Sequence, residues 1–190
     1  MLRSLYVLLI SLVMAGIVHI LIVLLVPSYA ERDAWGTLAE NGEPWSFSIV
    51  SSPDAPNEGL LPLVDPSFGV AACRFDLSQA PLVVETAGDV PYWSVALFDR
   101  QGQNIYSFND RTAIGRRLFM IVVDPVQMAR LRKSPPAESE NAVLVEADIK
   151  DGFVLIRALQ QDQSRNLETR AFLEKARCGR YVLPDQRNKG

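Results

Sequence analysis

The feature that most constrains this chain is an uncharged apolar run from Leu5 to Val26, near its N-terminus. As a helix, these 22 residues would be about 33 Å long at 1.5 Å per residue. The hydrocarbon core of a bilayer is about 30 Å thick, so the run is long enough to span it. A helix also bonds all of its own backbone polar groups, which a membrane span requires. The sequence therefore predicts one transmembrane helix.

A cleavable signal peptide is the alternative interpretation of this run. Ser28-Tyr29-Ala30 fits the small-residue pattern that precedes a cleavage site. The apolar part of a signal peptide is usually about 7–15 residues long, however, and this run is longer. We therefore expect residues 1–30 to be a retained anchor. In either case, the rest of the chain is exported.

The flanks of the run predict its orientation, and the charges beyond it limit the possible partners. Arg3 and the amino terminus precede the run, and the positive-inside rule keeps them in the cytoplasm. The exported part has a net charge of −4, because it holds all 22 acidic and 18 of the 19 basic residues. A mildly acidic chain without a lysine- or arginine-rich block excludes nucleic acid as a partner.

Residues with reactive side chains are few. The only cysteines, Cys73 and Cys178, lie in the exported part, where an even count favours one structural disulfide. Two buried free thiols are the alternative. The only histidine, His19, lies inside the apolar run. The exported part therefore cannot hold a Ser-His-Asp or Cys-His catalytic set or a histidine-ligated metal, and we expect no metal and no cofactor.

Short apolar runs separated by turn residues predict an α+β domain after residue 44. We expect mainly antiparallel β-structure in a sandwich-like arrangement, with two short helices besides the transmembrane helix. Capping residues predict these helices over 125–133, after Asp124, and over 166–178, before Gly179. In the second helix, Leu167, Ala171 and Cys178 recur at helical spacing, which predicts a buried stripe that includes Cys178. Strands are expected over residues 44–50, 68–77, 81–86, 92–99, 104–109, 118–123, 142–147 and 152–159.

Turn signals predict two hairpins among these strands. The first joins 92–99 to 104–109, with Asp99 opening the turn and Gly102 in the left-handed position. Both faces of its first strand are largely apolar, which predicts an inner strand covered on both sides. The second hairpin is expected to turn at Asp151-Gly152.

Arginines are the clearest candidates for binding. Arg111, Arg116 and Arg117 form a small basic cluster after the first hairpin. A solvated rim, or pairing with nearby acids, is the alternative interpretation. Arg157 interrupts the apolar run FVLIRAL, which indicates first a structural salt bridge and second a site for an anionic ligand.

Aromatic and acidic residues allow further interpretations. Tyr92 and Trp93 are most simply core aromatics. Asp76, Asp99 and Asp110 lie near predicted strand ends, where a carboxylate pair would suit glycoside hydrolysis. Aspartates at such positions are more often turn formers.

The segment PYWSVALFDRQGQNIYSFNDR, followed later by GFVLIRAL, resembles the bacterial domain-of-unknown-function 1254 family. The placing of Cys73 and Cys178 around it is similar to that in a short, membrane-anchored branch of the family. The positions that carry the resemblance are Tyr92, Trp93, Ser94, Asp99, Gly102, Tyr106, Ser107, Asn109, Asp110 and Arg157.

The resemblance implies an exported or membrane-attached, β-rich domain without an assigned reaction. Larger members carry a companion domain, number 1214, after this one, and this chain is too short to hold it. We therefore expect the companion to be a separate protein partner. The chain is expected to be a single-pass protein of the bacterial inner membrane. Residues 31–183 would form a periplasmic domain, followed by a polar tail at 184–190.

The expected function is that of a non-enzymatic binding or assembly module of the cell envelope, acting through a protein partner or an anionic ligand. The alternative is a carboxylate-dependent hydrolase or carbohydrate-active enzyme. No residue is assigned a catalytic role. The candidate binding residues are Arg111, Arg116, Arg157, Tyr92, Trp93 and Asn109.

Overall fold

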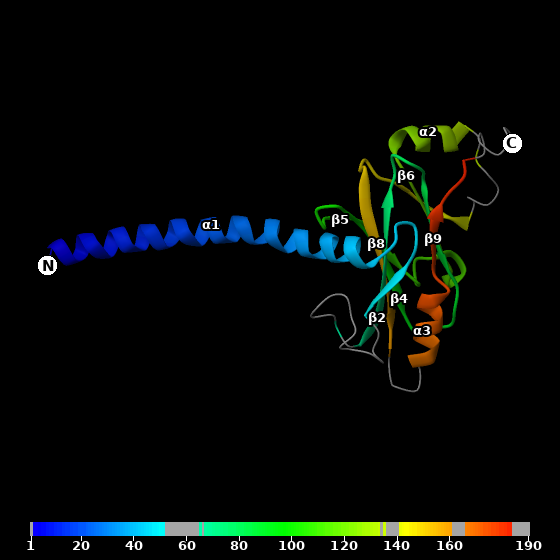
Figure 1. The fold of residues 1–190 in the computed structure, drawn as a ribbon, viewed down its shortest axis with the longest axis horizontal. Coiled ribbons are helices and arrows are strands. Elements are labelled where there is room, and N and C mark those ends of the chain that lie inside the picture. Colours follow the sequence, from blue (N-terminus) through cyan, green and yellow to red (C-terminus); the bar gives the residue numbers. More distant parts are fainter. Residues whose placement is uncertain are drawn as a thin grey trace.

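In the computed structural model, which describes residues 2–51, 65, 67–133, 135, 141–160 and 166–183, a long helix ends on a domain of two sheets (Figure 1). The predicted polar tail at 184–190 lies outside the described residues. The elements are α1 (Leu2–Asn41), β1 (Ser48–Ser51), β2 (Phe68–Asp76), β3 (Leu82–Thr86), β4 (Trp93–Asp99), β5 (Asn104–Asn109), the 3-10 helix η1 (Ile114–Arg116), β6 (Leu118–Val123), α2 (Pro125–Lys133), β7 (Val143–Glu146), β8 (Asp151–Leu159), α3 (Asn166–Glu174) and β9 (Arg177–Arg180).

The described strands form two sheets with one hydrophobic core between them. Sheet A has the order β1-β2-β8-β4-β5 and is antiparallel throughout. Sheet B has the order β7-β6-β3-β9 and is antiparallel except for the pair β6 and β7. We call the face of each sheet that points away from the other sheet its outer face. The predicted α+β fold with mainly antiparallel strands is confirmed.

Strand β4 shows how the alternating sequence pattern builds the core. Trp93, Val95 and Leu97 are buried between the sheets, whereas the residues between them are only half-buried on the outer face of sheet A. Because β8 and β5 flank it, β4 is the inner strand that the sequence predicts. Full cover on both faces was a wrong expectation, since the end of α1 covers only part of the outer face.

The first predicted hairpin, between β4 and β5, is confirmed. Gly102 has a φ of 81°, a conformation that glycine adopts without strain. Its N–H donates a hydrogen bond of 3.1 Å to the carbonyl of Asp99. The Asp99 carboxylate accepts a second bond of 2.8 Å from the N–H of Gln103. The turn is therefore stabilised by the two residue types that predicted it.

Helix α2 covers part of the outer face of sheet B. Met128 and Leu131 pack there on every second residue of β6. The remaining residues of β6 face the core between the sheets. The apolar run 118–123 is therefore covered on both of its faces. The Asp124 carboxylate accepts a hydrogen bond of 2.6 Å from the N–H of Gln127. The Gln127 side chain accepts one of 3.0 Å from the N–H of Asp124 in return. This reciprocal cap confirms the predicted helix start.

A disulfide joins the two sheets. Cys73 lies on β2 of sheet A and Cys178 on β9 of sheet B, 105 residues later in the chain. Their Cα atoms are 6.4 Å apart, and both side chains are buried. The predicted disulfide is confirmed, and it closes nearly the whole domain into one covalent loop.

The last helix is shorter than predicted. α3 ends at Glu174, so Cys178 and Gly179 belong to strand β9 rather than to a helix and its cap. The prediction was wrong because we assigned the burial of Cys178 to a helical stripe. The backbone there instead pairs with β3, which adds an edge strand to sheet B. Leu167, expected on the buried stripe, is 77% exposed. The buried residues of α3 are Thr169, Phe172 and Leu173.

The second predicted hairpin does not form. β7 lies in sheet B parallel to β6, whereas β8 lies in the middle of sheet A. Gly152 is therefore a strand residue, paired with Phe75 on one side and Asp99 on the other. It is needed for space rather than for a turn, because a Cβ at this position would collide with the carbonyl oxygen of Phe98.

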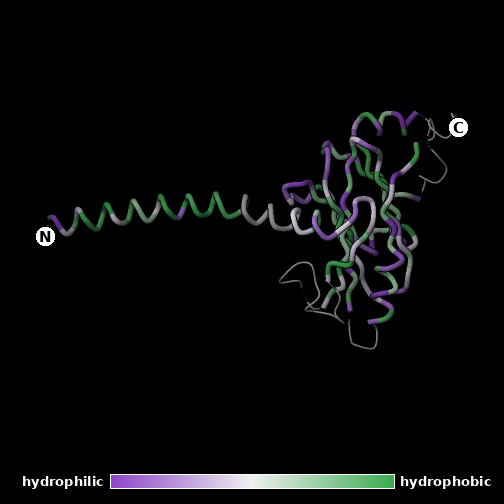
Figure 2. Tube along the Cα trace, in the orientation of Figure 1, coloured by the Kyte–Doolittle hydropathy of each residue, from purple (hydrophilic) through white to green (hydrophobic). Residues whose placement is uncertain are grey.

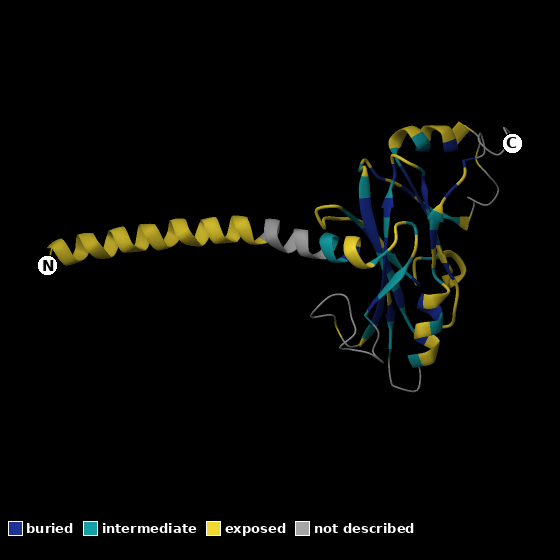
Figure 3. Ribbon diagram, in the orientation of Figure 1, coloured by how far each residue is buried: buried dark blue, intermediate teal, exposed yellow. Residues whose placement is uncertain are grey.

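Helix α1 continues well beyond the apolar run and ends on the domain. Its segment Leu2–Val26 is long and apolar enough to cross a membrane, as a signal sequence also is. Figures 2 and 3 show that most of this segment is hydrophobic and that all of it is exposed. Leu38, 2% exposed, packs with Val50 on the outer face of sheet A, and the Trp35 ring lies 6.4 Å from that of Phe153. The final turns of α1 are thus part of the domain.

Candidate functional site

A shallow hollow of about 380 Å³ lies on the outer face of sheet A, over β8, β4 and β5. Strand register places Arg157 of β8 beside Ser94 of β4, and Ser94 beside Asn109 of β5. Residues that stand opposite each other in a sheet share a face, so these three side chains form one row. The described residues that line the hollow are Tyr92, Ser94, Val95, Ala96, Phe98, Asn104, Ser107, Phe108, Asn109, Leu155 and Arg157.

Arg157 is the only charged residue among the described residues that line the hollow. Its side chain is exposed, and its guanidinium has no hydrogen bond or ion pair within the described part of the chain. The structural salt bridge that we expected for it is therefore not seen there. Its backbone is held in register by β2 on one side and β4 on the other. An exposed guanidinium without a partner in the described chain, on a strand held in register, is suited to binding a carboxylate or phosphate.

The neighbours of Arg157 add hydrogen-bond donors. Asn109 Oδ1 accepts a bond of 3.0 Å from the backbone N–H of Arg111. Because a backbone N–H can only donate, this bond fixes the orientation of the amide and leaves its Nδ2 donor for a ligand. The hydroxyls of Tyr92, Ser94 and Ser107 line the same hollow. The hollow thus combines one permanent positive charge with several donors.

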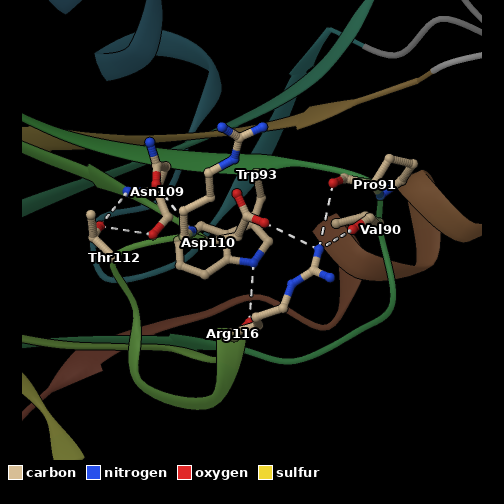
Figure 4. A network of polar contacts seen from close by, with 8 residues as sticks. Val90, Pro91, Trp93, Asn109, Asp110, Thr112 and Arg116 are labelled. Carbon is tan, nitrogen blue, oxygen red and sulfur yellow. Dashed lines mark hydrogen bonds and ion pairs between the residues drawn. The ribbon is translucent and has the colours of Figure 1, made fainter.

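Trp93 and Arg116 belong to a polar network behind the hollow, in which Figure 4 also draws the hollow residue Asn109. Trp93 is 1% exposed, and its indole Nε1 donates a bond of 3.2 Å to the carbonyl of Arg116. The Arg116 guanidinium lies 3.1 Å from the buried carboxylate of Asp110 and also reaches the carbonyls of Val90 and Pro91. Arg116 has a φ of 57°, a left-handed conformation that these contacts hold in place.

The six residues predicted for binding therefore fall into three groups. Arg157, Tyr92 and Asn109 meet in the hollow. Trp93 and Arg116 stabilise the loop behind it. The side chain of Arg111 is exposed and has no partner within the described chain.

The polar lining residues Ser94, Ser107 and Asn104 were not among the predicted binding residues. The period-two alternation of β4 places Ser94 on the same face as Tyr92, and this was the available signal for it. Arg157 reaches that face because β4 pairs with β8. This pairing joins residues 63 positions apart, so no pattern of neighbouring residues could have predicted it.

The carboxylates considered for hydrolysis have structural roles. Asp76 accepts hydrogen bonds from the side chain and N–H of Ser78, and these bonds, led by the one from the hydroxyl, lower the pKa of the Asp76 carboxyl below its ordinary value of 3.8. Asp99 stabilises the β4–β5 turn, and Asp110 pairs with Arg116. None of the described residues that line the hollow carries a carboxylate.

Comparison with solved structures shows the same fold in a longer protein. The crystal structure of the VPA0106 protein from Vibrio parahaemolyticus superposes with a TM-score of 0.59 at 12% identity, over 85% of this chain and 37% of that one. The chain thus spans little more than a third of that protein. A Burkholderia cenocepacia protein, described as uncharacterized, gives a TM-score of 0.44 at 15% identity, over 62% of this chain and 32% of its own.

Comparison at the sequence level identifies a family but no characterised relative. No curated protein matches the chain. Residues 63–179 match the family described as "Protein of unknown function (DUF1254)". The matched segment covers more than half of the chain and contains both disulfide cysteines and every residue of the hollow. The chain therefore belongs to the DUF1254 family.

Proposed function

We propose that this chain is an inner-membrane protein whose periplasmic domain binds an anionic group in the hollow around Arg157. The observation that carries the proposal is the exposed, unpaired guanidinium held at the centre of a sheet. The side chain is exposed to water rather than buried, so it is available to a ligand without first breaking an internal ion pair. We take an anion supplied from outside the chain as the partner of this guanidinium.

The chemistry of the hollow favours a small group with charged oxygens. A guanidinium binds carboxylate or phosphate through two parallel N–H bonds, and Asn109 and Ser94 stand in the same row to donate others. A hydrogen bond to a charged group contributes about 1.5–3 kcal/mol. The alternative function, a carboxylate-dependent hydrolase, needs two carboxylates on either side of a substrate. The described lining of the hollow contains none.

Replacing Arg157 by glutamine is expected to weaken anion binding by about tenfold or more, the equivalent of at least one charge-assisted hydrogen bond. The test is a titration of the full chain, in uncharged maltoside micelles, with inorganic phosphate. The Asn109 side-chain amide signal in NMR spectra reports occupancy of the hollow.

Arg132→Gln is the matched control for this titration. Arg132 is an exposed arginine of α2, on sheet B, where it pairs with Glu146 at 3.4 Å. The control is expected to bind phosphate as the wild type does. Equal affinity in the Arg157 and Arg132 variants, or an unchanged Asn109 signal in the wild type, would contradict the proposal.

We also propose that α1 is retained as a membrane anchor with its N-terminus in the cytoplasm. The helix passes without a break through Ser28-Tyr29-Ala30 and packs Leu38 against the domain. A helical segment must unfold locally before a protease can cleave it, which disfavours removal at Ala30. We expect the mature protein to remain in membranes after a carbonate wash. A mature N-terminus at Glu31 would show that the anchor is removed.

A protein partner in the cell envelope stays a prediction. The longer VPA0106 protein carries further polypeptide beside the shared fold, which is compatible with a companion supplied as a separate chain. Of the predicted basic cluster, Arg111 and Arg117 are exposed, whereas Arg116 is engaged by Asp110. A partner that binds this cluster would therefore meet Arg111 and Arg117 first.

A further inference from the structure

The end of α1 and the hollow share one face of the domain. The hollow residue Phe98 stacks on Phe153 with ring centroids 5.1 Å apart, and Phe153 in turn lies 6.4 Å from the ring of Trp35 on α1. The Arg74 guanidinium donates to the carbonyl of Gly42 at 2.6 Å and fastens the end of the helix to β2. Figure 1 shows α1 leaving the domain from the side of sheet A, with the strands running across its axis. The hollow therefore faces along α1, toward its apolar segment.

The length of α1 sets the distance between Trp35, beside the hollow's aromatic edge, and a bilayer that holds the apolar segment. Trp35 lies nine positions after Val26, the end of the apolar segment, which makes about 13.5 Å of helix. Each headgroup layer is about 5–7 Å thick. About 6–8 Å then remains between the headgroups and Trp35, a gap comparable to an extended arginine side chain. A typical helix tilt of about 20° changes this distance by only about 6%.

Of the arginines Arg74, Arg100 and Arg157 on this face, only Arg157 has no partner within the described residues. Arg74 is hydrogen-bonded to the end of α1, and Arg100 pairs with Asp151 at 3.6 Å while its guanidinium lies 5.5 Å from the centre of the Trp35 ring. Arg157 has no such contact within the described residues. Arg157 is thus the cation of one defined site, which differs from the binding of anionic membranes by a cluster of basic residues through charge alone.

We infer that the hollow binds the phosphate of a phospholipid headgroup in the same membrane that holds α1. The inference rests on the proposed anion site and assigns the source of its anion. Arg157 neutralises the phosphate, while Ser94, Asn109 and Tyr92 supply hydrogen-bond donors for the phosphate and the polar headgroup beside it. The membrane that holds α1 keeps headgroups at high local concentration within about 6–8 Å of Trp35, whereas a soluble anion must reach the hollow from bulk solvent.

The test is photo-crosslinking in nanodiscs made of phosphatidylcholine with phosphatidylglycerol that carries a photoreactive group on its glycerol. The full chain is expected to crosslink within β4, β5 or β8. Arg157→Gln should reduce this crosslinking by about tenfold, the loss of one charge-assisted hydrogen bond. Arg100→Gln is the matched control on the same face and should crosslink as the wild type does. An equal loss in both variants would overturn a specific site.

A second variant tests the geometry. Seven helix-forming residues inserted between Ala30 and Glu31 add two turns, which raises the domain by about 10.5 Å with little rotation. We expect this variant to lose the headgroup crosslink but to bind inorganic phosphate with wild-type affinity in micelles, which also shows that it is folded. An undiminished crosslink after insertion would overturn the inference.

The two experiments separate the inference from the proposed function. If wild-type protein binds inorganic phosphate but gives no crosslink in the hollow, the hollow takes a soluble anion and the lipid inference is wrong. If the wild type binds neither phosphate nor the headgroup, the proposed anion site fails as well.

Discussion

Replacing Cys73 or Cys178 by alanine is expected to cause the largest loss of stability of any single change proposed for this domain. The disulfide closes a loop between residues 105 apart, and in the chain-entropy model a loop of about 100 residues contributes about 4.7 kcal/mol. For a domain of this size, such a loss lowers the melting temperature by about 10–20 °C. Alanine is chosen because a serine hydroxyl would be buried without a partner at these sites.

Thermal unfolding of the full chain under oxidising conditions measures this effect. Reduced wild-type protein is the natural control, because it lacks the same bond without a change of sequence. Its melting temperature should lie close to those of both variants. If a variant melts within about 2 °C of the oxidised wild type, the cross-link contributes less than about 1 kcal/mol and the expectation is wrong.

Gly152→Ala is expected to destabilise the domain by about 3 kcal/mol, the upper part of the range for overpacking. Gly152 is buried in β8, and an added Cβ would collide with the carbonyl oxygen of Phe98 and lie 3.0 Å from the ring of Phe75. The carbonyl belongs to the backbone of β4 and cannot rotate away as a side chain can. Relief therefore requires β4 and β8 to separate, at the strand pair that carries the hollow.

Gly179→Ala provides the matched control, since it is also a strand glycine. A Cβ there would meet only Val83 Cγ1 at 3.9 Å, an ordinary contact. We expect its stability to stay within about 0.5 kcal/mol of the wild type. Denaturant unfolding of both variants measures the difference. Similar midpoints for the two variants would show that the sheet absorbs the extra methyl group and that the steric argument is mistaken.

Local signals predicted the elements whose structure depends on neighbours in sequence. The cap formed by Asp124 and Gln127 and the turn formed by Asp99 and Gly102 need only a few adjacent residues. Both were therefore predictable from residue type and spacing. The disulfide was predicted from the cysteine count and the exported setting rather than from geometry.

The wrong predictions concern choices between sheets. A turn signal at Asp151-Gly152 suggested that 142–147 and 152–159 pair, but each strand finds its partner elsewhere in the chain. Gly152 permits a turn and also permits a close strand contact, and only the tertiary structure decides between them. The burial of Cys178 is likewise compatible with a helix that has one buried face or with an edge strand. Cys178 lies in a strand because its backbone pairs with β3.

The candidate site was predictable in its parts but not as a whole. Tyr92, Asn109 and Arg157 stood out by residue type and by family resemblance. Their meeting depends on β8 inserting between β2 and β4, which no periodicity reveals. The same insertion explains why Arg157 is unpaired: its row on the sheet runs from Val70 through Ser94 to Asn109, and none of these residues is acidic.

The central position of β8 also determines when this domain can fold. β2 and β4 are made early, but the strand that lies between them ends at Leu159. Until that point has been synthesised, both strands have open edges, which are prone to aberrant pairing. Sheet A can therefore assemble only after the chain has been made as far as Leu159. Contacts between residues that are distant in sequence also make this assembly slow. Until the sheet has formed, the domain depends on chaperones to prevent aggregation.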